Sequence, residues 1–166
     1  RTLFNILGPM TNPAGANVQL TGVFAKELTT TIAEVLVRLG MKRAVIVWGE
    51  GNLDEMTITG ATHIADGHNG KVVTSILHPE EVGLTTADMA AIKGGATAAE
   101  SATQVRSVLG GEPGAKLDMV LLNAGTALMA AGKADSIVAG IGLAREVIGS
   151  GAALAKLEQL VKFSRG

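Results

Sequence analysis

Residues 44–48, Ala-Val-Ile-Val-Trp, form a short run of apolar side chains that ends at Gly49. A short continuous run of this kind is typical of a strand that is buried on both faces, as in a parallel sheet. Residues 17–24 alternate in part between apolar and polar and favour a second strand, and residues 26–39 place apolar side chains on one face of a helix. Strand, helix and strand in this order predict a βαβ unit, so we expect an α/β fold.

The rest of the chain is expected to add a small meander and then a helical region. Glycine-rich turns separate three strand-like stretches, which predict an antiparallel meander at 56–59, 62–65 and 71–77. Apolar residues at helical spacing predict a short turn or helix and four longer helices, at 86–92, 97–109, 117–131, 136–149 and 152–163. The predicted inner face of the second of these is Ala98, Ala102, Val105 and Leu109. The predicted apolar stripe of the last is Leu154, Leu157, Leu160 and Val161.

The charges of the chain nearly balance, with 14 lysines and arginines against 15 aspartates and glutamates. This balance gives no electrostatic reason to bind nucleic acid or an anionic membrane, so neither partner is expected. The sequence has no run of about 18 apolar residues and no pattern of a signal peptide. The absence of cysteine excludes disulfide bonds and thiolate metal ligands. Together these features predict a cytoplasmic protein.

The sharpest chemical pattern is residues 48–55, Trp-Gly-Glu-Gly-Asn-Leu-Asp-Glu, which follow the predicted buried strand directly. Ligands of open α/β sheets lie beyond the carboxyl ends of parallel strands, and glycines allow the backbone to turn sharply there. Asp54 and Glu55 are adjacent acids whose repulsion favours a cation between them, and carboxylate oxygens suit Mg²⁺. On position and composition alone, the pattern fits either a magnesium site or an ordinary solvated acidic loop.

The first fourteen residues read Arg-Thr-Leu-Phe-Asn-Ile-Leu-Gly-Pro-Met-Thr-Asn-Pro-Ala and closely resemble a signature of anthranilate phosphoribosyltransferases. Residues 52–55 are similar to a Gly-hydrophobic-Asp-Glu segment of that family, with Asn52 where glycine is common. Residues 78–84 and 151–157 support the resemblance, which covers nearly the whole chain. Asn123 begins a segment similar to the family's Asn-Ala-Ala and is interpreted as a packing and hydrogen-bonding anchor.

The resemblance implies an α/β catalytic domain of the nucleoside phosphorylase/phosphoribosyltransferase type, with a parallel or mixed sheet and flanking helices. It implies transfer of a phosphoribosyl group from phosphoribosyl pyrophosphate to anthranilate, which gives N-(5-phosphoribosyl)anthranilate and pyrophosphate in tryptophan biosynthesis. It assigns Asp54 and Glu55 to Mg²⁺, the expected cofactor, and Gly8 and Pro9 to a wall of the anthranilate pocket. No residue is assigned as a catalytic acid or base, and the full-length protein is expected to be a homodimer.

Two stretches that the resemblance requires are absent: a Gly-Thr-Gly-Gly-Asp loop for pyrophosphate and a Lys-His-Gly-Asn-Arg stretch near the substrates. Residues 1–166 are therefore expected to be the C-terminal part of the catalytic domain, with its N-terminal part missing, no internal domain boundary and no turnover of their own. The arginine that binds the anthranilate carboxylate in the family lies upstream of the signature, so Arg1 is expected to be structural.

Two other functions stay open at this point. One is a pyrimidine nucleoside phosphorylase-like paralogue with a related fold, against which the signature around Gly8 and Pro9 argues. The other is a non-catalytic binding module that keeps the fold. The choice of anthranilate or a nucleoside as substrate separates the first, and Mg²⁺-dependent binding of pyrophosphate disfavours the second.

Overall fold

The computed structural model describes residue 8 and residues 10–166. Its sheet has four strands in the order β1 (Val18–Gly22), β2 (Arg43–Gly49), β3 (Thr62–His68) and β4 (Lys71–Leu77). β1 and β2 are parallel, and helix α2 (Leu28–Arg38) connects them. β3 and β4 each run antiparallel to the strand before them. The predicted βαβ unit is thus confirmed, and the sheet is mixed.

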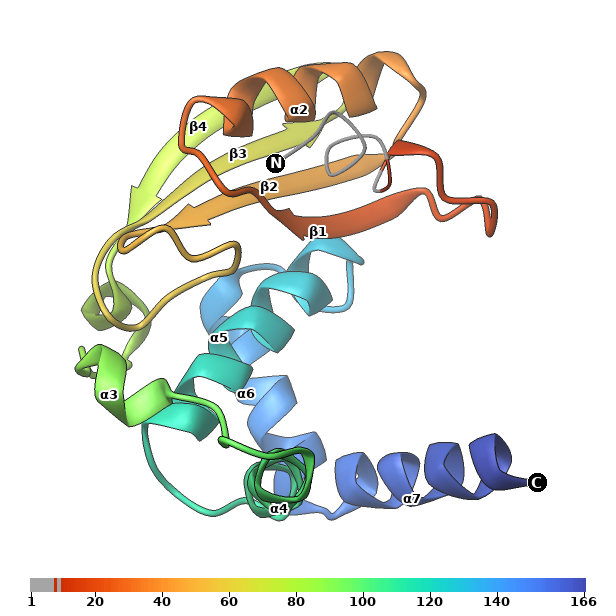
Figure 1. Cartoon of the computed structure of the whole chain (residues 1–166). Helices are drawn as coiled ribbons and strands as arrows, with labels where there is room; N and C mark the ends of the chain where they lie inside the picture. The colour runs from red at the N-terminus through yellow and green to blue at the C-terminus, as the bar shows by residue number, and fades with distance from the viewer. Residues whose placement is uncertain (1–7, 9) are drawn as a thin grey trace.

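β2 is buried on both faces of the sheet, between α2 and the helices on the opposite side (Figure 1). Residues 44–47 have no exposed surface. Ala44 and Ile46 pack in the cluster that includes α2, whereas Val45 and Val47 pack in the cluster on the other face. Successive side chains of a strand point to opposite faces, so a strand covered on both sides needs apolar residues at every position. The prediction for this strand is confirmed.

β3 and β4 form a hairpin whose first strand is longer than the sequence predicted. The turn is Asn69-Gly70, whose φ angles of 51° and 75° fit a two-residue type I′ turn. The sequence predicted that the turn begins at Asp66, which was wrong because β3 continues to His68. Asp66 is accommodated within the strand because its carboxylate pairs with Arg43 of β2.

The first predicted strand of the meander, residues 56–59, is wrong. These residues form a loop without strand pairing in which Met56, Thr57 and Ile58 are almost completely buried. Side chains take the place of a partner strand, because the Met56 N–H donates to Asn123 Oδ1 and the Thr57 N–H donates to Thr62 Oγ1. Burial does not separate this loop from a strand, because residues 44–47 of β2 are buried just as continuously; the difference is that residues 56–59 have no backbone pairing with a neighbouring strand.

The helices lie on the face of the sheet opposite α2 and extend away from it (Figure 1). They are the 3₁₀ turn η1 (Pro79–Val82), α3 (Met89–Ile92), α4 (Ala98–Leu109), α5 (Ala115–Ala130), α6 (Ile137–Gly149) and α7 (Ala152–Arg165). Thr97 and Ser136 cap α4 and α6, each accepting a hydrogen bond from a backbone N–H three residues later. The five predicted helical segments are therefore confirmed, with ends that differ by a few residues.

The predicted inner face of α4 is wrong except at Leu109, which is half-buried. Val108 is buried, whereas Val105 is 47% exposed, and Ala98 and Ala102 are exposed as well. Ser101, Gln104 and Val108 turn toward the core instead. Alanines at helical spacing fit an apolar face in sequence, but they bury too little area to fix which side of a helix faces inward.

α7 lies at the edge of the molecule, away from the sheet (Figure 1), and none of its residues is buried. Its predicted stripe is only partly covered, and Leu160 is 61% exposed. An ion pair between Arg106 and Glu158 joins α4 to α7. Among the described residues, no single helix has the length and apolar character to cross a membrane, although α6 and α7 together, bent by 66°, meet both criteria.

α5 and α6 touch through glycine. A Cβ placed on Gly140 would lie 2.2 Å from the Gly125 carbonyl oxygen, and one placed on Gly125 would lie 2.6 Å from the Ile141 nitrogen. Both distances are far below van der Waals contact, so the two backbones pack directly against each other. This contact seats α6 on α5, which in turn packs against the sheet.

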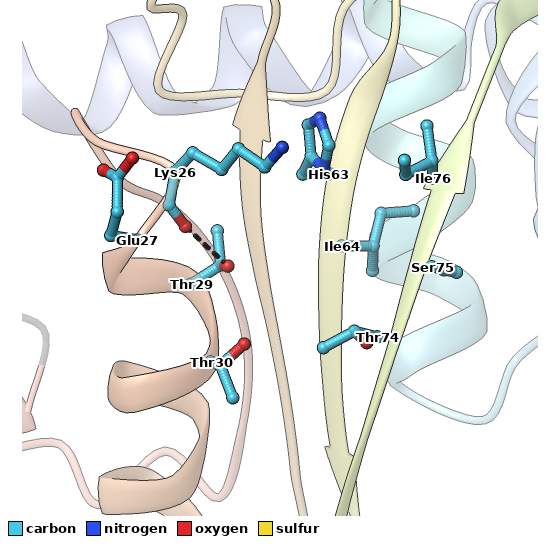
Figure 2. Close-up of a pocket in the computed structure, with 9 residues that line it drawn as sticks. All are labelled: Lys26, Glu27, Thr29, Thr30, His63, Ile64, Thr74, Ser75 and Ile76. Atoms are coloured by element: carbon cyan, nitrogen blue, oxygen red, sulfur yellow. Dashed lines mark hydrogen bonds between the residues drawn. The ribbon is translucent and has the colours of Figure 1, made fainter.

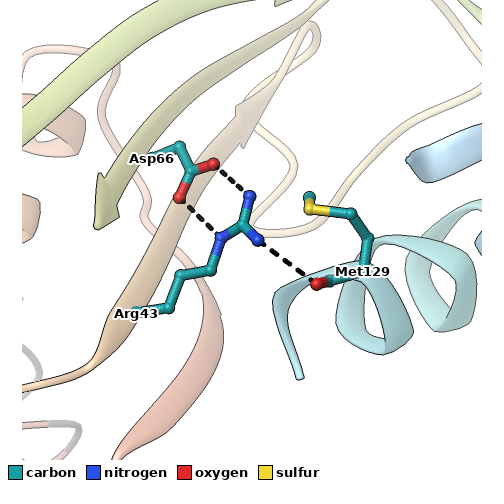
Figure 3. Close-up of polar contacts among 3 residues, drawn as sticks. All are labelled: Arg43, Asp66 and Met129. Atoms are coloured by element: carbon teal, nitrogen blue, oxygen red, sulfur yellow. Dashed lines mark hydrogen bonds and ion pairs between the residues drawn. The ribbon is translucent and has the colours of Figure 1, made fainter. Parts of the chain in front are cut away.

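Arg43 ties the sheet to the end of α5 (Figure 3). Its Nε and Nη2 atoms donate to the two carboxylate oxygens of Asp66 at 3.0 and 2.6 Å, and Nη1 donates to the Met129 carbonyl at 3.3 Å. The last carbonyls of a helix lack partners within it, and a cation at that end is favourable. The bidentate pair therefore fixes the guanidinium where it also holds α5 against β2 and β3.

The glycine contact between α5 and α6 can be tested by adding one methyl group. We expect Gly125→Ala to lower the free energy of unfolding by about 3 kcal/mol, because the backbones must separate. Gly142→Ala on α6 is the matched control, since a Cβ there meets nothing within 4 Å. Alanine has the higher helix propensity, so the control should raise the free energy of unfolding by about 0.5–1 kcal/mol. Urea denaturation measures both, and equal effects of the two substitutions would contradict the packing.

Candidate functional site

The acidic loop leaves β2 at its carboxyl end, at the edge of the sheet where the sequence placed it. The loop turns at Gly51 and Asn52, whose φ angles are 86° and 64°. The Gly49 N–H donates to the Leu53 carbonyl at 2.8 Å, and the Leu53 N–H donates back to Gly49 at 3.1 Å. A left-handed backbone favours glycine and tolerates asparagine, which explains why Asn52 fits where the resembling family commonly has glycine.

Asp54 is held against the end of β1 by a glycine. A Cβ on Gly22 would lie 1.5 Å from the Asp54 carbonyl oxygen, so no other residue fits there without moving the loop. β1 and β2 are neighbours in the sheet, and this contact lays the loop of one across the end of the other. The predicted strand at 17–24 includes Gly22 without assigning it a contact. A glycine at the carboxyl end of a strand is the sequence signal that would have indicated the close approach of another backbone.

The first and last residues of the loop between β2 and β3, Glu50 and Ala61, are hydrogen-bonded to each other. The Glu50 N–H donates to the Ala61 carbonyl at 2.8 Å, and Glu50 Oε2 accepts from the Ala61 N–H at 3.0 Å. Asn123 of α5 binds the backbone of Met56 on both sides. The interpretation of Asn123 as a hydrogen-bonding anchor is confirmed, and the residue lies in the middle of α5.

Glu55 lines a cleft of about 340 Å³ between the loop and helices α4 and α5. Its other polar lining residues are Ser101, Gln104 and Lys116. Partial desolvation of the Glu55 carboxyl group raises its pKa, and the neighbouring charge of Asp54 raises the pKa further. Both acids remain open to solvent. An ion bound between them would relieve the repulsion that now raises the pKa.

Within the part of the chain that the structure describes, no three side chains of His, Asp or Glu come together as a complete metal site. The assignment of Asp54 and Glu55 to Mg²⁺ therefore stays a prediction. Mg²⁺ is commonly held by one or two carboxylates together with phosphate oxygens, so it does not require a third acidic side chain.

The predicted acceptor wall is described only in part. Pro9, like Arg1, lies outside the described residues. Gly8 is exposed, and its carbonyl accepts a hydrogen bond from the Thr11 N–H at 3.3 Å. Gly8 is not among the residues that line the Glu55 cleft, so the structure does not bring it to that cleft. Its assignment to an anthranilate pocket stays a prediction.

A second cleft, of about 620 Å³, lies between the start of α2 and strands β3 and β4 (Figure 2). Lys26 reaches across its mouth toward His63 (Figure 2). His63 lies on β3, within the predicted strand at 62–65, and is partly covered, with its ring 5.6 Å from the ring of Trp48. Desolvation and then the Lys26 charge lower the pKa of His63, while Glu50 acts in the opposite direction.

The comparisons with known proteins agree with this architecture. A model of the glycosyl transferase family, a/b domain, matches residues 1–154. The chain belongs to this family. It is 64% identical over 163 residues to the anthranilate phosphoribosyltransferase of Desulfotalea psychrophila, covering 98% of this chain and 47% of that protein. It is 49% identical to the enzyme of the same name from Geotalea uraniireducens, covering 99% and 47%.

Solved structures of this glycosyl transferase family match in the same way. The crystal structure of anthranilate phosphoribosyltransferase from Thermus thermophilus superposes with a TM-score of 0.90 at 44% identity, covering 100% of this chain and 49% of that chain. The Saccharomyces cerevisiae enzyme in complex with PRPP and Mg has a TM-score of 0.82 at 29% identity, covering 95% and 46%. The chain thus spans about half the length of the relatives it matches, and the resemblance read from the sequence is confirmed.

The raised pKa of Glu55 makes a prediction about stability. An acid whose pKa is higher in the folded state stabilises the fold at pH values below its unfolded pKa, and this contribution is lost as the pH rises through the folded value. Glu55→Gln removes the ionisation, so we expect the variant to gain stability relative to the parent chain as the pH rises above about 4.3, the ordinary pKa of glutamate. Urea denaturation at several pH values measures the difference in the free energy of unfolding between variant and parent. The control is Glu34→Gln, which replaces an exposed acid on α2. A difference for Glu55→Gln that does not change with pH would contradict a raised pKa of Glu55.

Proposed function

We propose that this chain serves the transfer of a phosphoribosyl group from phosphoribosyl pyrophosphate to anthranilate, which produces N-(5-phosphoribosyl)anthranilate and pyrophosphate in tryptophan biosynthesis. The observation that carries the proposal is the pair Asp54 and Glu55, held open to solvent on a loop at the carboxyl end of β2. The name of the 64% identical relative supports the substrate class. The Mg and PRPP bound to the yeast enzyme support the metal.

In this proposal Asp54 and Glu55 hold Mg²⁺. Breaking the bond between ribose C1 and pyrophosphate leaves positive charge on the sugar and negative charge on the leaving group. The bound ion would supply electrostatic stabilisation of the departing pyrophosphate. Lys116, in the same cleft as Glu55, adds a further positive charge for phosphate oxygens. Gly8 and Pro9 would form part of the wall of the anthranilate pocket.

The acceptor amine of anthranilate is already a nucleophile, so the site needs positioning more than a strong base. This agrees with a loop whose proposed task is to present the two adjacent acids Asp54 and Glu55. Nothing in the proposed role asks a side chain of this loop to donate or accept a proton. The loop's task is to keep two carboxylates in a fixed place.

We propose further that residues 1–166 form the C-terminal part of the α/β catalytic domain and act together with the rest of a longer, homodimeric protein. The chain contains neither the Gly-Thr-Gly-Gly-Asp loop nor the Lys-His-Gly-Asn-Arg stretch. It also spans about half of each relative. We therefore expect no turnover from these residues alone, and turnover close to that of an intact enzyme would refute this part.

The metal role can be tested on the 166-residue chain by isothermal titration with inorganic pyrophosphate, with and without Mg²⁺. We expect binding that depends on Mg²⁺ and that Asp54→Ala with Glu55→Ala abolishes. The control is Glu34→Ala with Glu146→Ala, which removes two exposed acids of α2 and α6 and so changes the net charge equally. Pyrophosphate binding by the loop variant at the parent affinity would contradict the proposal.

A further inference from the structure

We propose that Asn123 is a positioning residue that holds Glu55 in place for metal binding, an inference that rests on the proposed function. Asn123 Oδ1 accepts from the Met56 N–H at 3.0 Å, and Asn123 Nδ2 donates to the Met56 carbonyl at 2.9 Å. Nδ2 also donates to the Met119 carbonyl, one turn earlier on α5, at 3.0 Å. One orientation of the amide satisfies all three bonds, and the flipped orientation would set donor against donor and acceptor against acceptor.

Asn123 forms a hydrogen bond with the peptide unit that joins Glu55 to Met56. The N–H of Met56 belongs to the same planar unit as the Glu55 carbonyl. On the other side of this unit, a Cβ placed on Gly49 would lie 2.8 Å from the Glu55 carbonyl oxygen. The unit therefore lies between the asparagine amide and the end of β2. The Met56 side chain is completely buried, so the residue after Glu55 is fixed by its side chain and by its backbone.

The two acids are thus held by different means. Asp54 is pressed against Gly22 by contact, whereas the peptide next to Glu55 is held by directional hydrogen bonds from α5. Two carboxylates that share one small ion must keep their relative positions to within about 0.5 Å. Neighbouring residues of a free loop do not, because each has its own backbone rotations. Asn123 removes that freedom on the Glu55 side.

The stability of α5 does not depend on this amide alone. Arg43 already joins the end of α5 to the sheet, and Gly125 packs against α6. The buried hydroxyl of Thr126 bonds to the Leu122 carbonyl of its own helix at 2.8 Å and makes no bond to the loop. Thr126 is therefore a matched control, since Thr126→Val removes a buried hydrogen bond from the same helix and leaves the acids as they are.

The test uses the 166-residue chain, with Mn²⁺ and inorganic pyrophosphate as probes. Paramagnetic broadening of the Asp54, Glu55 and Met56 amide signals reports binding at the loop, and a titration gives the dissociation constant. We expect Asn123→Ala to weaken binding about tenfold and Thr126→Val to leave it unchanged. Thermal unfolding of both variants shows how much stability each has lost.

Asn123→Asp keeps the side-chain volume in case truncation unfolds the chain. It loses both donations to carbonyls and adds a negative charge near the site. Positioning predicts weaker binding of Mn²⁺, whereas attraction to the added charge predicts tighter binding. Tighter binding by this variant, or parent-like binding by a folded Asn123→Ala chain, overturns the role of Asn123.

The outcomes also separate this role from the proposed function. Suppose that the Asp54→Ala, Glu55→Ala double variant loses binding and the folded Asn123 variants keep it. This result overturns the positioning role of Asn123 and leaves the metal role of the acids in place. Binding that the double variant keeps, or a parent chain whose loop signals do not broaden, overturns the metal role and with it the task given to Asn123. Loss of binding in both Asn123 variants, with parent-like binding in Thr126→Val, supports the proposal.

Discussion

The structure depends on the burial of β2 between two helical layers. Because residues 44–47 are fully covered on both faces, the position and direction of this strand are fixed with little freedom. The loop that follows β2 therefore starts from a strand that is packed on both faces. α2 holds one side of the strand, and α5 holds the other, with Arg43 as the polar link between the sheet and the end of α5.

The change of direction between β2 and β3 determines where the acids lie. β1 and β2 are parallel, but β3 runs back along β2 from Thr62, opposite Gly49. The connecting loop therefore has to leave and re-enter the sheet at the same edge, where the parallel strands present their carboxyl ends. Its two ends are closed by the backbone and side chain of Glu50 against Ala61. A loop closed in this way exposes Asp54 and Glu55 while its two ends stay hydrogen-bonded to each other.

Much of the fold followed from the sequence, and the failures have physical causes. The βαβ unit and the four longer helices were predictable because their apolar periods are long, and Thr97 and Ser136 mark the starts of α4 and α6. The start of the β3–β4 turn was misplaced because Asp66 looks like a turn residue until its partner Arg43 is known. The loop at 56–59 looked like a strand because its apolar content was visible, whereas its bonds to the Asn123 and Thr62 side chains were not.

In the candidate site, features that depend on neighbouring residues could be predicted, and contacts between residues far apart in sequence could not. The acids themselves were predictable from their place after a buried strand, and the resemblance added the metal. The supports of the acids were not predictable, because Gly22 and Asn123 act across 32 and 68 residues of sequence on Asp54 and Glu55. Turns between elements account for only part of the glycine content. Gly22, Gly49, Gly125 and Gly140 instead permit backbones to touch, so part of the glycine content reflects close packing around the loop and the helices behind it rather than chain reversal.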